Sequence, residues 1–243
     1  MVAQNDKLVA ARIRGLYVIT PEKTDFNLLE SMLDEAFRAG VRLLQYRRKN
    51  TTHGFDEAER CCRMAHASGA TFIVNDHLDL AVSVNADGVH WGKDDVPMAA
   101  LAERIRDAKS LRGANFIVGV SCYNDLSRAT AAVAAGADYV AFGSMFASPT
   151  KPNAPQAGLD TVRAARRTLG VPIVAIGGIT RDNAATVIAA GADALAVIAD
   201  LFPSAAETVP GGITAQVHTY LPLFENCLHH VCPIQHQQQP RPV

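Results

Sequence analysis

A short unit, in which a helix ends at glycine and a β-branched run follows within a few residues, recurs along the chain. The phrases AAGADYVAFGS and AAGADALAVIA are near copies of each other. The predicted helix-ending glycines are Gly40, Gly69, Gly136, Gly170 and Gly191. Glycine often ends helices because it adopts the left-handed backbone conformation without steric cost. Internal repetition of this kind restricts the chain to a fold built from repeated strand–helix units.

Eight strands are predicted from short apolar runs separated by stretches with helical spacing. They occupy residues 15–20, 42–47, 72–74, 88–91, 116–120, 139–143, 172–177 and 195–198. Strands that alternate with helices are expected to be parallel, and a chain of 243 residues suits a closed (β/α)8 barrel, the TIM barrel. An open doubly wound sheet is the alternative, but it normally has fewer strands and one crevice. The α/β TIM barrel is therefore the predicted fold.

One domain is predicted, with short segments at both ends. Residues 1–14 form a polar leader, residues 15–210 the barrel and residues 211–228 a helical extension. Residues 229–243 are rich in Gln, His and Pro and are predicted to be disordered. The cysteines and histidines near the C-terminus lack the paired spacing of a zinc site, so only adventitious metal binding is expected there.

Composition and charge disfavour several classes of function. The formal net charge is −1 and 19% of the residues are charged, so no nucleic-acid partner and no affinity for acidic membranes are expected. No segment has the uninterrupted apolar length of a signal peptide core or a membrane span, which predicts a cytoplasmic enzyme with no membrane partner. The five cysteines show no framework spacing, and no structural disulfide is expected.

Polar residues follow nearly every predicted strand, where (β/α)8 enzymes place their reacting groups. They combine cations, carboxylates and hydroxyls without an evident nucleophile–base pair. Such a set favours phosphate chemistry, in which cations neutralise phosphoryl oxygens and a metal ion bridges a diphosphate. The strand-end residues are Gln45, Arg47, Lys49, Asn75, Asp76, Asp94, Asp95, Ser121, Ser148, Thr150, Lys151, Gly177 and Gly178.

Asp76 and Asp95 follow two consecutive strands and are predicted to hold one Mg²⁺ ion. Without a metal, the two carboxylates would repel each other and a polyanionic substrate by on the order of 1 kcal/mol. Capping of the following helices is the alternative role, and it is common for Asp after a strand. The basic residues at the other strand ends favour the metal site. His77, Asp79 and Asp94 are predicted to take no part.

An anion site is predicted after the sixth and seventh strands. Gly177 and Gly178 end a strand and precede a helix, so backbone N–H groups there can receive a phosphate. The loop from Ser148 to Lys151 adds two hydroxyls and a cation. Barrels of this type frequently bind a phosphate at the loops after strands seven and eight.

Several residues keep a purely structural alternative. Arg47 and Lys49 could form a solvated rim, and this is the favoured interpretation of Arg48 between them. His90 lies among apolar neighbours and is predicted to be a packed core histidine, while Trp91 either lines a pocket or fills the rim. Cys122 is not expected to be a nucleophile, because no histidine lies near it in sequence to activate a thiolate.

Six segments stand in order at successive strand ends: QYRRK at 45–49, VNDH at 74–77, ADGVHWGKDD at 86–95, GVS at 119–121, SPTK at 148–151 and AIGGIT at 175–180. These segments resemble the motifs of the thiamine phosphate synthase family, and the resemblance spans residues 15–202. It implies that a hydroxymethylpyrimidine diphosphate and a hydroxyethylthiazole phosphate, or its carboxylated form, are joined with release of diphosphate. One Mg²⁺ per active site, held by Asp76 and Asp95, is implied as cofactor.

The resemblance also implies a role for each matching residue. The implied catalytic residues are Arg47, Lys49, Ser121 and Lys151. The implied substrate-binding residues are Gln45, Tyr46, Arg47, Arg48, Lys49, Asn75, Ser121, Ser148, Pro149, Thr150, Lys151, Gly178, Ile198 and Ala199. Two positions depart from the family pattern, since Ser148 stands where many members carry threonine and Ala199 where many carry serine. The second change removes one hydrogen bond, worth about 0.5–1.5 kcal/mol, that a backbone N–H or water can replace.

The implied mechanism is dissociative: the diphosphate departs, a pyrimidine methylene cation forms, and the thiazole nitrogen captures it. No general base is required. Two rival functions stay open, a thiazole tautomerase-like relative and a non-catalytic barrel that binds thiazole phosphate. Retention of the cations and carboxylates at the strand ends disfavours both. Small-molecule substrates are the predicted partners, and a homo-oligomer is left open.

Overall fold

Eight parallel strands close into a barrel in sequence order, with β8 pairing against β1, so the predicted TIM barrel is confirmed. The computed structural model describes residues 2–48, 54–92, 95–146, 157–202 and 212–225. The strands are β1 (Gly15–Ile19), β2 (Leu43–Tyr46), β3 (Thr71–Asn75), β4 (Gly88–Trp91), β5 (Ile117–Tyr123), β6 (Tyr139–Phe142), β7 (Ile173–Ile176) and β8 (Ala194–Val197).

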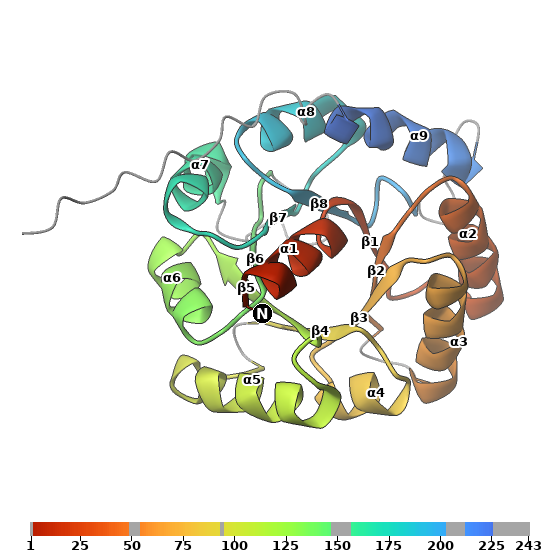
Figure 1. Cartoon of the computed structure of the whole chain (residues 1–243). Coiled ribbons are helices and arrows are strands. Elements are labelled where there is room, and N and C mark those ends of the chain that lie inside the picture. The colour runs from red at the N-terminus through yellow and green to blue at the C-terminus, as the bar shows by residue number, and fades with distance from the viewer. Residues whose placement is uncertain (1, 49–53, 93–94, 147–156, 203–211, 226–243) are drawn as a thin grey trace, which may run out of the picture.

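The helices surround this barrel, except for α1, which lies across its centre in the view of Figure 1. They are α1 (Val2–Arg12), α2 (Phe26–Arg38), α3 (Gly54–Ala67), α4 (Leu78–Ser83), α5 (Met98–Arg112), α6 (Leu126–Ala134), α7 (Gly158–Thr168), α8 (Arg181–Ala189) and α9 (Gly212–Glu225).

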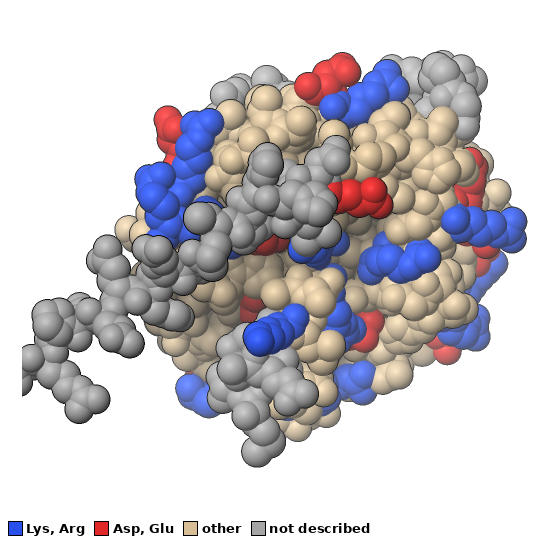
Figure 2. Space-filling model, turned by 45° about the horizontal axis from the view of Figure 1, so that its top comes forward, with Lys and Arg blue, Asp and Glu red and all other residues tan. Residues whose placement is uncertain are grey.

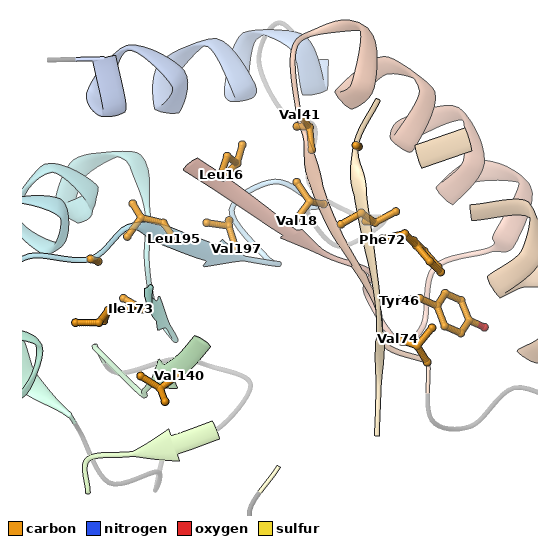
Figure 3. Close-up of a cluster of buried hydrophobic side chains, with 14 of the residues drawn as sticks. Leu16, Val18, Val41, Tyr46, Phe72, Val74, Val140, Ile173, Leu195 and Val197 are labelled. Carbon is orange, nitrogen blue, oxygen red and sulfur yellow. The ribbon is translucent and has the colours of Figure 1, made fainter. Parts of the chain in front are cut away.

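Side chains alternate along each strand between two separate cores, as the period of two in a strand requires. The outer core lies between the strands and the surrounding helices and contains Leu16, Val18, Phe72 and Val74, some of the side chains drawn in Figure 3. The inner core fills the barrel and contains residues that alternate with these, such as Tyr17 and Ile73. A side chain therefore reaches the barrel interior only from one set of alternate strand positions.

Helix α1 closes the end of the barrel at which the strands begin. Its Val9, together with Ile13 just beyond it, belongs to the inner core. Arg12 donates to the hydroxyl of Thr71 at the start of β3 (3.2 Å) and forms an ion pair with Asp87, just before β4 (2.5 Å). The segment predicted as a polar leader is thus a helix with a defined place in the fold.

Helix α9 belongs to the ring of helices, although its sequence predicts an extension outside the barrel domain. It lies between α8 and α2 (Figure 1). Arg181 of α8 donates to Gln216 (3.2 Å), and the backbone N–H of Thr214 donates to Glu35 of α2 (2.9 Å). Val217 and Tyr220 are buried against the barrel. A boundary at residue 210 therefore separates the barrel from its last helix.

The predicted glycine ends of helices are confirmed, and at four of the five positions the glycine adopts the left-handed conformation. Gly40, Gly69, Gly136 and Gly191 have φ values of 112°, 68°, 101° and 115°. Gly170 also follows the end of a helix, because α7 ends at Thr168, but Leu169 before it is extended and Gly170 itself has no positive φ.

One aspartate in each of three repeats clamps the start of the preceding strand. Its backbone N–H donates to a carbonyl of that strand, and its side chain accepts the N–H of the same strand residue. The pairs are Asp87 with Phe72, Asp138 with Val118 and Asp193 with Ile173. The distances from the strand N–H nitrogen to the carboxylate oxygen are 2.8, 2.8 and 2.7 Å. Each carboxylate also pairs with a cation, which is Arg12, Lys109 or Arg166 respectively. Asp138 and Asp193 stand in the two near-copied GAD phrases, which thus encode a structural joint between neighbouring strands.

The surface shown in Figure 2 carries acidic and basic side chains side by side, in keeping with the formal net charge of −1. Within the described ranges, no helix has the length and apolar character needed to cross a membrane.

The aspartate joint predicts a large stability effect for a single substitution. Asp138→Ala removes the acceptor of the Val118 N–H and the partner of Lys109, and it should lower the free energy of unfolding by about 2–3 kcal/mol. Asp107→Ala, at an exposed position of α5, is the control and should change it by less than about 0.5 kcal/mol. Urea denaturation of both variants measures the difference, and equal stabilities would contradict the joint.

Candidate active site

Three of the predicted site residues lie on inward-facing strand positions near the carboxyl ends of β2, β3 and β5. Gln45 follows the inward-facing Leu43 by two residues, Asn75 follows Ile73, and Ser121 is in line with Ile117. Asn75 is the last residue of β3, and Gln45 is buried. The structure therefore brings amide and hydroxyl groups from β2, β3 and β5 to one end of the barrel.

Asp76 and Asp95 line one cavity of about 360 Å³, as their strand-end positions predict. The cavity is also lined by Trp91 and Val96 and by residues of α4 and α5. Two of these, His77 and Asp79, were predicted to take no part, and Arg104 of α5 was not predicted at all. Arg104 lies within α5, 13 residues from the end of β4 and 13 from the start of β5, so a search of strand ends does not find it.

Asp76 has a backbone conformation that is unusual for its residue type. Its φ is 64°, in the left-handed region, where non-glycine residues are uncommon and often functional. Two contacts hold it there: its N–H donates to the carbonyl of His90 (2.9 Å), and the Trp91 indole donates to its own carbonyl (3.1 Å). Trp91 thus lines the cavity and fixes the backbone that carries the Asp76 carboxylate.

The Asp95 carboxylate is held from the backbone of its own loop. Its Oδ2 accepts the N–H of Gly92 at 2.8 Å. A Cβ atom at Gly92 would lie 2.5 Å from the same oxygen, so this approach requires glycine. Gly92 therefore sets where the Asp95 carboxylate lies.

Neither carboxylate occupies the capping position that was the structural alternative. The N-cap of α4 is His77 and that of α5 is Pro97. By contrast, Asp25 and Asp125 do cap α2 and α6, with carboxylates that accept backbone N–H groups of the first turn. The fold uses aspartate caps elsewhere, and Asp76 and Asp95 have a different placement.

The three residues after Gln45 have different surroundings. Arg47 lies 3.7 Å from Glu22 and is partly exposed. The Arg48 Nε lies 2.9 Å from Glu57 of α3, an ion pair without hydrogen-bond alignment, and its Nη1 donates to the carbonyl of Thr24 (2.7 Å). The solvated-rim interpretation of Arg48 is therefore wrong, since 11% of its side chain is exposed.

Tyr46 faces the helices and not the barrel interior (Figure 3). Its hydroxyl donates to Glu57 at 2.9 Å, and burial is the main cause that raises the pKa of this phenol. Its side chain therefore belongs to the joint between β2 and α3, and its contact with substrate stays a prediction.

The predicted anion site is described in part. Gly177 and Gly178 have φ values of 98° and 65°, and a Cβ at Gly177 would lie 2.3 Å from the Ser144 hydroxyl. The Asn183 side chain donates to the Gly178 carbonyl (2.9 Å) and accepts the Thr180 N–H (3.0 Å), which fixes the turn that opens α8. After β8, Ile198 is partly buried and Ala199 is exposed in a turn.

Several predicted residues lie outside the part of the chain that the structure describes. They are Lys49, Asp94, Ser148, Pro149, Thr150 and Lys151. The C-terminal cysteines and histidines at 227–236 also lie outside the described part.

A chain of hydrogen bonds between buried side chains crosses the barrel interior. Gln45 donates to the Tyr17 hydroxyl (2.9 Å), which contacts the Tyr139 hydroxyl (3.0 Å). Tyr139 contacts Nδ1 of His90 (2.9 Å), and Nε2 of His90 contacts the Ser121 hydroxyl (2.9 Å). Two predicted substrate-binding residues, Gln45 and Ser121, are the ends of this chain.

His90 is buried as predicted, but its contacts are polar on both ring nitrogens and its ring stacks on Tyr139 at 5.4 Å between centroids. Burial lowers the pKa of His90 from 6.5 to about 4, although the Asp95 carboxylate acts in the opposite direction. The imidazole is therefore neutral at neutral pH. Tyr17 and Tyr139 were not predicted, because the distance of 122 residues between them hides their contact in the sequence.

The cysteines that the structure describes carry no reactive thiolate. Cys61, Cys62 and Cys122 are buried and form no disulfide, and burial raises the pKa of each thiol to about 12. Cys122 faces the outer core, in agreement with the prediction that it is not a nucleophile.

The lowered pKa of His90 predicts an acid-sensitive term in stability. Below about pH 6.5 the unfolded state binds a proton at this histidine, whereas the folded state does not until about pH 4, so folding weakens as the pH falls through this window. The term is on the order of 3 kcal/mol. His90→Gln removes it, so urea denaturation between these pH values should show a shallower loss than in the unsubstituted protein. Parallel pH curves would contradict the assignment.

Comparisons with known proteins show the family to which the chain belongs. A family model described as thiamine monophosphate synthase matches residues 16–201. A thiamine-phosphate synthase from Aromatoleum aromaticum is 47% identical over 193 residues, 79% of this chain and 89% of that protein. A thiamine-phosphate synthase from Bordetella pertussis is 46% identical over 196 residues, 77% of this chain and 87% of that protein.

Solved structures show the same relationship. A thiamine phosphate pyrophosphorylase from Pyrococcus furiosus superposes with a TM-score of 0.74 at 30% identity and covers 91% of this chain and 99% of that one. A 3-hexulose-6-phosphate synthase from Salmonella typhimurium, at 15% identity and a TM-score of 0.67 over 87% and 99% of the two chains, shares the fold alone. Because the family model and the relatives cover most of its length, the chain belongs to the thiamine monophosphate synthase family.

Proposed function

We propose that this protein joins a hydroxymethylpyrimidine diphosphate to a hydroxyethylthiazole phosphate, or its carboxylated form, and releases diphosphate with thiamine phosphate. Its family membership makes it a transferase of thiamine biosynthesis. The observation that carries the proposal for this site is the placement of Asp76 and Asp95 on one cavity, at the same end of the barrel as the polar groups of β2, β3 and β5.

The donor set of the cavity fits a single Mg²⁺ ion. The ion commonly takes one or two protein carboxylates and completes its octahedral shell with water and substrate phosphate oxygens. Asp76 and Asp95 supply that number of carboxylates, and among the described residues no group of three or more metal-ligating side chains competes with them. A bound Mg²⁺ would offset the charge of the diphosphate and make it a better leaving group.

The residues of the chain then have separable tasks. Arg47, with Lys49 and Lys151 by family resemblance, neutralises the diphosphate oxygens and stabilises the departing group. Gln45, Asn75 and Ser121 orient the pyrimidine diphosphate with directional hydrogen bonds. The turn at Gly178 and the backbone around Ile198 and Ala199, with Ser148 to Thr150, hold the thiazole phosphate. Alignment of two bound reactants and electrostatic stabilisation supply the rate enhancement.

A general base is not part of this mechanism, and the described interior agrees with that. Both nitrogens of His90, the imidazole in the barrel interior, are engaged by Tyr139 and Ser121. The thiazole nitrogen reaches the methylene carbon as a neutral nucleophile, so no proton has to be removed from it. The cationic methylene carbon forms as the bond to the diphosphate breaks.

The rival functions make different demands on the site. A thiazole tautomerase moves a proton and needs no leaving-group clamp, whereas a silent binding barrel needs neither carboxylate. The positive φ of Asp76 and the close approach of Gly92 to Asp95 place two carboxylates on the cavity. Neither rival function requires these two carboxylates. Cytoplasmic localisation, the absence of nucleic-acid and membrane partners, and homo-oligomer formation stay predictions.

Removal of the metal tests the function directly. Purified protein with both substrates and Mg²⁺ should form thiamine phosphate and diphosphate, and chelation by EDTA should abolish product formation, because the carboxylates would then repel the diphosphate. Addition of excess Mg²⁺ should restore the activity. An unchanged rate after chelation would refute the role of the two carboxylates, and binding of thiazole phosphate without turnover would favour the silent barrel.

A substitution beside Asp95 tests the carboxylate placement without changing a ligand. Gly92→Ala places a methyl group against Asp95 Oδ2 and displaces the carboxylate, so the Mg²⁺ concentration for half-maximal activity should rise about tenfold or more. Gly170→Ala is the matched control, because a Cβ there meets nothing within 4 Å. Titration of activity with Mg²⁺ gives both values, and equal values would contradict the role of Gly92.

A further inference from the structure

In the hydrogen-bond chain of the barrel interior, which group donates and which accepts at each contact follows from the Gln45 end. The side-chain nitrogen of Gln45 is a donor and cannot accept, so the Tyr17 oxygen receives its proton. The phenol of Tyr17 has one proton of its own. The neighbouring acceptor for this proton is the Tyr139 oxygen, 3.0 Å away.

The same reasoning passes from Tyr139 to Ser121. Because the Tyr139 oxygen accepts from Tyr17, its own proton is directed to Nδ1 of His90. Nδ1 is then the unprotonated nitrogen, and the single imidazole proton lies on Nε2, from which it is donated to the Ser121 oxygen. Ser121 has thus used an acceptor site internally, and its own O–H points away from His90.

The reverse order would leave an unsatisfied donor in the core. If the imidazole proton were on Nδ1, His90 would donate to Tyr139, and Tyr139 would have to donate to Tyr17. The Tyr17 oxygen would then receive two protons, and its own O–H would lack an acceptor in the chain. Tyr17 is buried with 1% of its surface exposed, so water cannot take that role. A buried unsatisfied donor is strongly disfavoured in proteins.

The packing around the chain is specific to it. Tyr17 on β1 and Tyr139 on β6 are not on neighbouring strands, so their contact crosses the barrel. Between β4 and β6, the ring of Tyr139 occupies the space beside Gly119, where a Cβ atom would lie 2.0 Å from the ring. Glycine at 119 therefore makes room for a tyrosine that reaches His90 past an intervening strand.

We propose that Tyr17, Tyr139 and His90 are positioning residues that make the Ser121 hydroxyl a hydrogen-bond donor to an anionic oxygen of the diphosphate substrate. At the other end they fix the Gln45 amide, with its nitrogen turned to Tyr17 and its oxygen left as an acceptor for a substrate N–H. The inference rests on the proposed function for the identity of the substrate, but the order of the protons is a property of the protein itself.

The proton order is tested by NMR of protein with 15N-labelled histidine, without substrate. Two-bond 15N–1H correlations at neutral pH should show His90 as a neutral ring with its proton on Nε2, and the His90→Gln protein identifies its signals. A proton on Nδ1, or on both nitrogens, would overturn the proposal. Because this readout needs no activity, it separates failure of the chain from failure of the proposed function.

The consequence for the substrate is tested with Tyr139→Phe, which removes one hydroxyl and keeps the ring beside Gly119. The KM for the pyrimidine diphosphate should rise about tenfold, the factor for one lost hydrogen bond, while the KM for the thiazole phosphate stays within about twofold. Tyr220→Phe is the control, because Tyr220 of α9 is also a fully buried tyrosine, and its hydroxyl donates to Asp200 (2.6 Å) outside the hydrogen-bond chain. Its KM for the pyrimidine diphosphate should stay within about twofold of the unsubstituted value. Equal pyrimidine KM values in the two variants would overturn the positioning role.

Discussion

Closure of eight parallel strands forces alternate side chains from every strand into one enclosed space, and the rest of the structure depends on how that space is filled. Apolar side chains such as Ile73, Ile117 and Val174 fill most of it. Tyr139, Gly119 and His90 are in register on three successive strands and form a polar layer within it. The barrel is thus apolar and packed toward the end closed by α1, and polar toward the end at which Asn75, Asp76 and Ser121 leave their strands.

This constraint explains which features the sequence reveals. Parallel strands place their carboxyl ends at one rim, so strand ends alone predict that Gln45, Asn75, Asp76, Asp95 and Ser121 lie at the same end of the fold. Contacts across the interior depend on register and tilt, which a linear sequence does not contain. Tyr17 and Tyr139 therefore look like ordinary strand residues. Helix α1 is hidden for a related reason, because Val9 and Ile13 gain their role only when the barrel that they cover has closed.

Aspartate shows the limit of residue type as evidence. Asp25 and Asp125 cap helices, Asp87 and Asp138 clamp strands, and Asp76 and Asp95 line a cavity. All stand in similar polar surroundings next to apolar runs. Backbone geometry distinguishes them, since a clamp needs the carboxylate to accept the N–H of the preceding strand and the cavity position needs a positive φ or a neighbouring glycine. Residue type is equally misleading for Arg48. Its charge predicts an exposed side chain, but the ion pair with Glu57 holds the side chain mostly buried between β2 and α3.

The charge distribution of the interior bears on the chemistry. A site that stabilises a departing diphosphate needs cations and directional donors at the rim, and it gains from neutral surroundings beneath them, where the low dielectric strengthens each contact. Burial keeps His90 neutral, and the pKa values of Tyr17 and Tyr139 are raised by the same burial, so the polar layer carries no net charge at neutral pH. Such a layer can orient Gln45 and Ser121 without competing for the diphosphate charge. Hydrogen bonding in the interior and charge at the rim are therefore divided between different residues, as the proposed mechanism, which relies on electrostatic stabilisation without proton transfer, requires.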